Sequence, residues 1–247
     1  MFVANRMTKN PITVEPTTSV NDAAKLMKQR KIRRLPVVEK GRLVGIISDR
    51  DVMRVAPSPA TTLSKFEIMS LLDKMTVAEI MAKEVVSLPD TATIEEAALV
   101  MYNERLSGLP VVSSMGAVIG IITETDVFKT FVDVMGLADG KTRLTLDVVD
   151  KVGVVKELAG IIADAGYNID SMVTCKQAAM SGRFEIVIRL DADNVDDIKD
   201  KIEAKGYKII HIAKIGQWDV FFSLTEYIIK KRLISPCLLG MVSVNHN

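Results

Sequence analysis

The sequence predicts an α+β protein: a β-α-β-β-α unit that occurs twice, followed by a ferredoxin-like βαββαβ unit. Three observations support this fold class. Short strand-forming segments recur at a fixed spacing, each copy contains a helix with an N-cap signal, and the hydrophobic pattern changes at about residue 142. Repeats at fixed spacing indicate duplicated structural units, and the order of helices and strands indicates how each unit folds.

The duplication is clearest in the strand-forming segments. The tetrapeptide Leu-Pro-Val-Val at 35–38 recurs at 109–112, 74 residues later. Gly-Ile-Ile at 45–47 recurs at 120–122, after one extra residue near Gly116. In each copy a short polar segment, 39–42 or 113–116, separates the two strand-forming segments, as is typical of a hairpin turn. One such unit has too few layers to bury its faces, so we expect the two copies to pack together.

A capped helix precedes each hairpin. Ser19 and Thr93 occupy N-cap positions, with Asp22 and Glu96 three residues later, as in a capping box. Apolar residues then recur at i, i+3, i+4 and i+7, which predicts one buried stripe on each helix. These residues are Val20, Ala23, Ala24 and Met27 in the first copy, and Ile94, Ala97, Ala98 and Met101 in the second.

A further helix connects the copies. It follows a break at Pro57 and Pro59, and Ser64 with Glu67 forms its capping pair. We therefore assign residues 1–75 to the first copy with its connecting helix, and residues 76–138 to the second.

The third unit extends over residues 142–216. Segments with strand character lie near 144–148, 169–175, 184–190 and 207–215, and helical spacing is seen at 154–162 and 195–202. Gly166 and Gly206 follow the two helices, where a left-handed C-terminal residue is common. Residues 217–247 form a C-terminal extension of unassigned role, in which 221–229 has the pattern of an amphipathic helix.

Composition excludes several classes of protein. The 247 residues are 48% hydrophobic and carry a formal charge of +1, without the basic excess of nucleic-acid binders. No apolar run is long enough for a membrane span, and no leader sequence is recognised, so we expect a cytoplasmic protein. Cys175 and Cys237 are interpreted as buried thiols in a reducing compartment. His211 and His246 lack the spacing of metal ligands, so we expect no metal site.

The duplicated unit resembles a CBS-domain pair, also called a Bateman module. The Leu-Pro-Val-Val and Gly-Ile-Ile strands and the endings at 48–51 and 123–126 carry this resemblance. The third unit resembles an ACT domain, through Asp-Lys-Val-Gly at 150–153 and Gly-Tyr-Asn-Ile at 166–169, although Val152 replaces the usual proline. The order of the three units is similar to that of the acetoin-utilisation accessory protein B family.

The CBS resemblance implies an adenosine-type ligand in the cleft between the copies. In that family a Ser/Thr-x-x-Asp motif commonly contacts phosphate and ribose, which assigns phosphate to Ser48 and Thr123 and ribose to Asp51 and Asp126. Arg33 and Arg34 precede Leu35, where the second copy has Ser107 and Gly108, so we expect the arginines of the first copy to anchor the phosphate end. The adenine slot is assigned to the first strand of each copy, expected at 12–14 and 85–87, and to the prolines of the second strands. The residues are Thr13, Val14, Pro36, Val86, Ser87 and Pro110. The alternative is that the motif residues only cap helices and the arginines form a solvated charge pair.

The ACT resemblance implies an amino-acid effector site at the first strand-to-helix turn and a partner's strand. Asp150, Gly153 and Asn168 occupy the matching positions. The alternative is a dimerisation domain that binds no ligand.

These observations favour a non-enzymatic regulatory protein, since no catalytic motif is recognised. We expect it to bind AMP, ADP, ATP, NAD or S-adenosylmethionine as a regulatory ligand, to require no cofactor, to form a homodimer and to regulate a partner enzyme. The alternative is a ligand-free dimerisation or interaction module. An enzyme acting on a nucleotide and a transcription regulator are weaker alternatives, because neither has a supporting motif.

Overall fold

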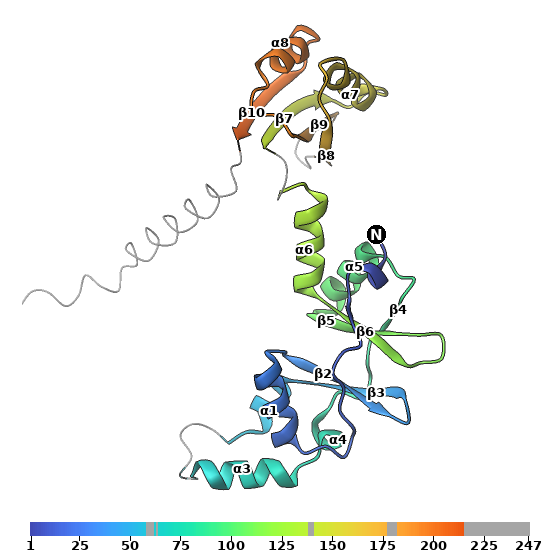
Figure 1. The fold of residues 1–247 in the computed structure, drawn as a ribbon, viewed down its shortest axis with the longest axis vertical. Helices are drawn as coiled ribbons and strands as arrows, with labels where there is room; N and C mark the ends of the chain where they lie inside the picture. Colours follow the sequence, from blue (N-terminus) through green and yellow to red (C-terminus); the bar gives the residue numbers. More distant parts are fainter. Residues whose placement is uncertain (58–61, 63, 138–140, 177–181, 215–247) are drawn as a thin grey trace, which may run out of the picture. The chain divides into compact units, whose positions relative to one another are not determined.

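The computed structural model describes residues 1–57, 62, 64–137, 141–176 and 182–214 (Figure 1). The chain divides into two compact units, Met1–Thr130 and Phe131–Asn247, and each is described by itself. The C-terminal extension at 217–247 lies outside the described residues.

The first unit contains both copies of the duplicated motif. The first copy and the connecting segment comprise η1 (Val3–Asn5), β1 (Thr8–Lys9), α1 (Val20–Arg30), β2 (Arg34–Glu39), β3 (Arg42–Ser48), α2 (Asp49–Val55), α3 (Lys65–Lys74) and α4 (Val77–Ile80). The second copy comprises β4 (Leu88–Pro89), α5 (Ile94–Glu104), β5 (Gly108–Val112), β6 (Val118–Thr123) and α6 (Glu124–Val134), which extends past the boundary between the units.

The predicted hairpins are present in both copies. β2 and β3 pair antiparallel around Lys40 and Gly41, whose φ angles of 48° and 79° give a two-residue turn with both residues left-handed. β5 and β6 pair in the same way around the longer turn that contains Gly116.

The helix N-caps also follow the sequence prediction. Ser19 Oγ accepts a hydrogen bond from the Asp22 amide, and Thr93 with Glu96 completes a reciprocal capping box. Ser64 and Glu67 do the same at the start of α3. Each of these bonds satisfies an amide that the helix itself leaves without an acceptor.

The two copies exchange their leading segments. β1, from the start of the chain, pairs antiparallel with β6 of the second copy, whereas Ala82 bridges to Ile46 in β3 of the first copy. Two methionines pack across the exchange in equivalent positions. Met7 Sδ lies so close to Gly120 of β6, and Met81 Sδ so close to Gly45 of β3, that a Cβ at either glycine would overlap the sulfur atom. Neither copy is therefore complete without the other.

The exchange also corrects one strand prediction. Residues 85–87 are not a strand, since β4 begins only at Leu88 and pairs with β5. The first copy retains a single bridge, between Val14 and Val37, in the corresponding place. The reason is that the chain before β4 contacts the first copy at Ala82. It joins the sheet of the second copy only at Leu88, where β4 pairs with β5.

The second unit is a four-stranded antiparallel sheet with two helices. Its elements are β7 (Thr142–Val149), α7 (Val154–Asp164), β8 (Ile169–Lys176), β9 (Arg183–Leu190), α8 (Asp196–Ala204) and β10 (Lys208–Lys214), in the sheet order β10-β7-β9-β8. Leu144, Leu146, Ile186 and Ile188 are buried in one core with Leu158 and Ile162 of α7 and Ile198 and Ile202 of α8. Both helices thus cover the same face, as the βαββαβ prediction requires.

Two further observations concern single features. Cys175 is exposed on β8, so its interpretation as a buried thiol is wrong; β8 is an edge strand, and its register gives Cys175 no core position. Within the described part of the chain, no helix has the length and apolar character needed to cross a membrane.

Candidate functional site

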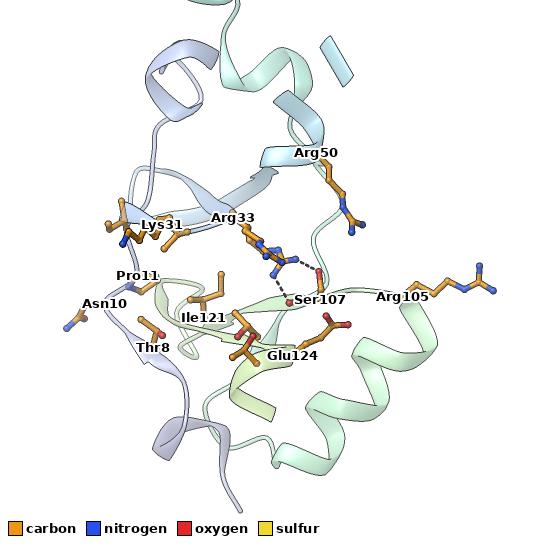
Figure 2. Close-up of a pocket in the computed structure, with 15 residues that line it drawn as sticks. Thr8, Asn10, Pro11, Lys31, Arg33, Arg50, Arg105, Ser107, Ile121 and Glu124 are labelled. Atoms are coloured by element: carbon orange, nitrogen blue, oxygen red, sulfur yellow. Dashed lines mark hydrogen bonds between the residues drawn. The ribbon is translucent and has the colours of Figure 1, made fainter. Parts of the chain in front are cut away.

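A cavity of about 630 Å³ lies between the two copies in the first unit (Figure 2). Its volume is in the range of small-molecule sites. The first copy contributes the 31–34 segment and Arg50, the second contributes Arg105, Ser107, Ile121 and residues 123–125, and the leading segment contributes Thr8 and residues 10–12.

Arg34 connects the two walls of this cavity. It lies at the start of β2, and its side chain reaches the second copy, where Nη1 donates to the Ser107 carbonyl oxygen at 2.5 Å and Nη2 donates to Ser107 Oγ. Gly108 makes this approach feasible, because a Cβ there would overlap Arg34 Nη1.

The repeat explains why these residues meet. Position 108 is the counterpart of position 34, and the two lie opposite one another where the copies face each other. Two arginines at these positions would bring like charges together in a partly buried place. The combination of one arginine with serine and glycine avoids this repulsion and lets one guanidinium cross between the copies.

The cavity lining is strongly basic. It includes Lys31, Arg33, Arg34, Arg50 and Arg105, against the single acidic residue Glu124. Burial lowers the pKa of the Arg34 guanidinium, while the negative charges of Glu124 and Asp49 act in the opposite direction. Arginine stays protonated in proteins, so the lining presents a positive field that favours anionic groups.

Apolar side chains complete the lining. They are Pro11, Ile12, Ile32 and Ile121, three of which are β-branched isoleucines. Such residues offer a surface for a flat ring, whereas the basic residues offer donors for charged oxygens. The cavity therefore suits a ligand with both an aromatic and an anionic part.

The two Ser/Thr-x-x-Asp motifs form capping boxes. Ser48 Oγ donates to Asp51 Oδ2 at 2.6 Å, and Thr123 Oγ1 donates to Asp126 Oδ2 at 2.6 Å. The same two carboxylate oxygens accept the backbone amides of Ser48 and Thr123 at 2.9 Å. The helix-capping role that the sequence left open is thus observed, and it leaves Oδ1 of each aspartate outside the box.

The structure brings together only some of the residues assigned to the nucleotide site. Arg33, Arg34 and Thr123 line the cavity, whereas Ser48, Asp51 and Asp126 lie outside its lining. Val14, Pro36 and Pro110 are buried within their copies, Thr13 and Val86 are exposed, and Ser87 is half-buried outside the lining.

The strand exchange explains which residues the sequence analysis missed. Thr8, Asn10, Pro11 and Ile12 meet the Thr123 turn because β1 pairs with β6. Sequence periodicity indicated the repeat but not which copy each leading segment joins. Lys31 and Arg105 could have been found from the sequence. They occupy equivalent positions in the two copies, and both are basic residues at the C-terminal end of a helix.

The residues assigned to the ACT effector site do not meet within one chain. Asp150 and Gly153 follow the end of β7, whereas Asn168 precedes Ile169, whose partner Leu190 pairs with Thr142 at the beginning of β7. The length of an eight-residue strand, about 25 Å, separates the two groups. A site that uses both groups therefore requires a second chain, as the expectation of a partner's strand implies.

Two protein families match this chain, one in each of its two parts. The sequence model of the CBS domain matches residues 3–58 and 77–133, and that of the ACT domain matches residues 142–206. A CBS domain-containing protein of Dictyostelium discoideum is 32% identical over 136 residues, which cover 55% of this chain and 94% of that protein.

Two curated enzymes match over the CBS region alone. An L-aspartate semialdehyde sulfurtransferase of Methanocaldococcus jannaschii is 31% identical over 131 residues, and an inosine-5′-monophosphate dehydrogenase of Korarchaeum cryptofilum is 37% identical over 120 residues. The match covers 53% and 49% of this chain but only 23% and 22% of those enzymes. CBS pairs similar to this one thus occur both in a protein with little else and as parts of enzymes.

Three solved structures are also similar. CBSX2 of Arabidopsis thaliana in complex with AMP is 30% identical, with 53% of this chain and 96% of that chain covered and a TM-score of 0.45. The CBS pair of protein MJ0100 with 5-methylthioadenosine and S-adenosyl-L-methionine is 30% identical, with 53% and 95% covered and a TM-score of 0.45. A protein of Vibrio cholerae described as an acetoin utilization protein (AcuB) is 30% identical, with 56% and 94% covered and a TM-score of 0.46.

The duplicated unit with its exchanged leading segments and shared cavity defines a tandem CBS-domain protein, and the chain belongs to this family. Its second unit is an ACT domain, so two CBS domains are followed by one ACT domain.

Proposed function

We propose that the cavity between the CBS domains binds a phosphorylated adenine nucleotide, and that the protein is a non-enzymatic regulator that responds to this ligand. The observation that carries the proposal is the cavity lining, in which five basic residues accompany apolar residues. The apolar residues receive the base, and the arginines bind phosphate oxygens through charge-assisted hydrogen bonds.

The charge of the lining favours phosphate-bearing ligands over S-adenosylmethionine. AMP and S-adenosylmethionine are both bound by solved CBS pairs of other proteins. S-adenosylmethionine carries a sulfonium cation, which the five basic residues repel and only Glu124 attracts. AMP, ADP and ATP carry increasing negative charge, so we propose that this protein selects among them and thereby senses energy supply.

Binding would favour one arrangement of the two CBS domains. The Arg34 guanidinium holds Ser107 of the opposite domain and lies in the cavity lining, so a phosphate group there competes with Ser107 for its donors. A ligand shifts a conformational equilibrium only through different affinities for its states. Such a difference arises if the Arg34 guanidinium binds Ser107 in one state and the ligand phosphate in the other, because this contact joins the two domains.

Calorimetric titration of the purified chain tests the proposal. We expect AMP, ADP or ATP to bind at least about tenfold more tightly than S-adenosylmethionine and adenosine, since loss of one charge-assisted contact costs roughly 1.5–3 kcal/mol. The Arg34→Met variant should lose this preference, whereas the matched control Arg42→Met, an exposed arginine at the start of β3, should keep it. Absence of binding to every nucleotide by folded protein would refute the ligand proposal.

The second candidate function is a dimerisation module without ligand. Leu99 and Tyr102, which are 60% and 83% exposed and lie three residues apart on α5, favour burial of this helix against a second copy. In either case we propose a cytoplasmic homodimer that regulates a partner enzyme. Sedimentation of the chain and of Tyr102→Glu distinguishes a dimer that uses α5 from a monomer.

A further inference from the structure

The helix-free face of the ACT sheet carries two arginines opposite each other. Arg189 in β9 pairs directly with Arg143 in β7, so both side chains project from the same face. This face is opposite the one covered by α7 and α8, because the alternate residues Leu144, Ile188 and Leu190 belong to the helix-covered core. Like charges in directly opposed positions destabilise a sheet, and an anion bound between them would offset this repulsion.

Arg189 is buried without sufficient hydrogen-bond partners. Only 3% of the residue is exposed, and its Nε and Nη1 atoms are buried and have no acceptor. Burial and the positive charge of Arg143 both lower the pKa of this guanidinium. A buried arginine is normally paired, because an unpaired buried charge costs several kcal/mol.

Thr145 adds a second unpaired polar group on the same face. It is two residues from Arg143 along β7, it is 4% exposed, and its Oγ1 is also buried without a partner. Its opposite residue in β9 is Val187, which lies two residues from Arg189. The two unpaired groups thus come from neighbouring rows of the same sheet face.

In the described part of the chain no carboxylate accepts from Arg189 Nε or Nη1 or from Thr145 Oγ1, and Asp170, which lies beside the Arg189 side chain near Gly136, makes no hydrogen bond to these atoms. Within the described residues, neither Arg143 nor Arg189 forms an ion pair, whereas Arg183 on the same face binds Asp147 through Nε and Nη2 at 2.9 Å. The Arg189 side chain passes close to Gly136, next to the Met135 carbonyl oxygen that accepts from Ser171 Oγ at 2.9 Å. Arg143 is partly exposed, so its guanidinium is accessible to solvent beside the buried Arg189.

We propose that Arg189, Arg143 and Thr145 form an oxyanion-binding site on the helix-free face of the ACT sheet. The ligand is a small molecule with a carboxylate, or free phosphate, because guanidinium groups and a hydroxyl donate to both. The site differs from the positions assigned to an amino-acid effector, Asp150, Gly153 and Asn168, and is independent of the nucleotide cavity. It gives the ACT domain an input that uses residues of one chain.

The test is calorimetric titration of the full chain with citrate, glutamate and inorganic phosphate at constant ionic strength. Binding of citrate or glutamate alone identifies a carboxylate ligand, and binding of phosphate alone identifies free phosphate. Arg189→Met should weaken binding at least about tenfold, since it removes a charge-assisted contact. Lys208→Met, a matched loss of charge on β10, should leave it unchanged.

Thermal unfolding separates this role from a structural one. Without the anion, Arg189→Met should be as stable as the parent chain or more stable, because an unpaired buried charge has been removed. With the anion, the melting temperature of the parent chain should rise and that of the variant should not. The proposal is overturned if none of the three anions binds, or if Arg189→Met binds as tightly as the parent chain.

Discussion

Substitution of Gly108 by alanine tests the contact between the CBS domains. Gly108 does not have a positive φ angle, so alanine suits the backbone of β5. An added Cβ would nevertheless overlap Arg34 Nη1 and lie 3.2 Å from Cζ and 3.3 Å from Cδ. The guanidinium must therefore move away, and its hydrogen bonds to Ser107 must break.

The magnitude follows from those hydrogen bonds. Arg34 makes two of them to Ser107, and a hydrogen bond to a charged group contributes roughly 1.5–3 kcal/mol. Replacement of glycine by alanine also stabilises by about 0.4–1 kcal/mol through the unfolded chain. Loss of both bonds, less this gain, should lower the free energy of unfolding of the first unit by about 2–5 kcal/mol in Gly108→Ala.

A double-mutant cycle isolates the cause. In an Arg34→Ala background the overlapping atoms are absent, so Gly108→Ala should cost less than about 0.5 kcal/mol or stabilise slightly. Hydrogen exchange of the β5 and β6 amides is a suitable assay, because it reports on the CBS pair without a contribution from the ACT domain. The control is Arg42→Ala, at an exposed position of β3. Ala97→Gly is unsuitable as a control, because it also lowers the helix propensity of α5.

Two results would refute this reasoning. Additive effects of Gly108→Ala and Arg34→Ala would show that the two positions do not interact. Unchanged stability of Gly108→Ala in the parent background would show that the Arg34 bonds contribute little.

Three further results are expected. Thr123→Ala should cost about 1 kcal/mol in chemical denaturation because α6 loses its N-cap, and Thr123→Ser should restore most of it. Burial, with the hydrogen bond to Glu157, raises the pKa of Tyr207 to about 12, so the folded state holds the phenol proton more tightly. The raised pKa of Tyr207 therefore stabilises the folded ACT domain below about pH 10, and this contribution is lost as the pH rises toward 12. The loss amounts to about 1.4 kcal/mol for each unit by which the pKa is raised, and Tyr207→Phe should not show it in thermal melts at alkaline pH. Gly120→Ala should destabilise the CBS pair in thermal melts by about 1–3 kcal/mol, because its Cβ overlaps Met7 Sδ and lies 2.9 Å from Cγ, and Met7→Ala should remove most of the penalty.

The candidate nucleotide site was only partly predictable. Arg33 and Arg34 were identified because the repeat places Ser107 and Gly108 at their counterpart positions, and the structure shows Arg34 bound to Ser107. Thr8 and residues 10–12 carry no motif and belong to the cavity only because β1 joins the opposite sheet. Asp51 and Asp126 fit both a ribose site and a capping box, and sequence spacing is the same in the two cases.

Local sequence patterns are sufficient to predict most helices and strands and their order. Helix N-caps, apolar periodicity and the 74-residue repeat are local signals, and they predicted α1, α5, both hairpins and the βαββαβ unit. The tertiary structure alone decided which copy each leading segment completes, that Arg34 crosses between the CBS domains, and that Arg189 lies opposite Arg143. These facts depend on strand pairing between residues far apart in the chain, which periodicity and capping motifs do not encode because they describe only neighbours in sequence.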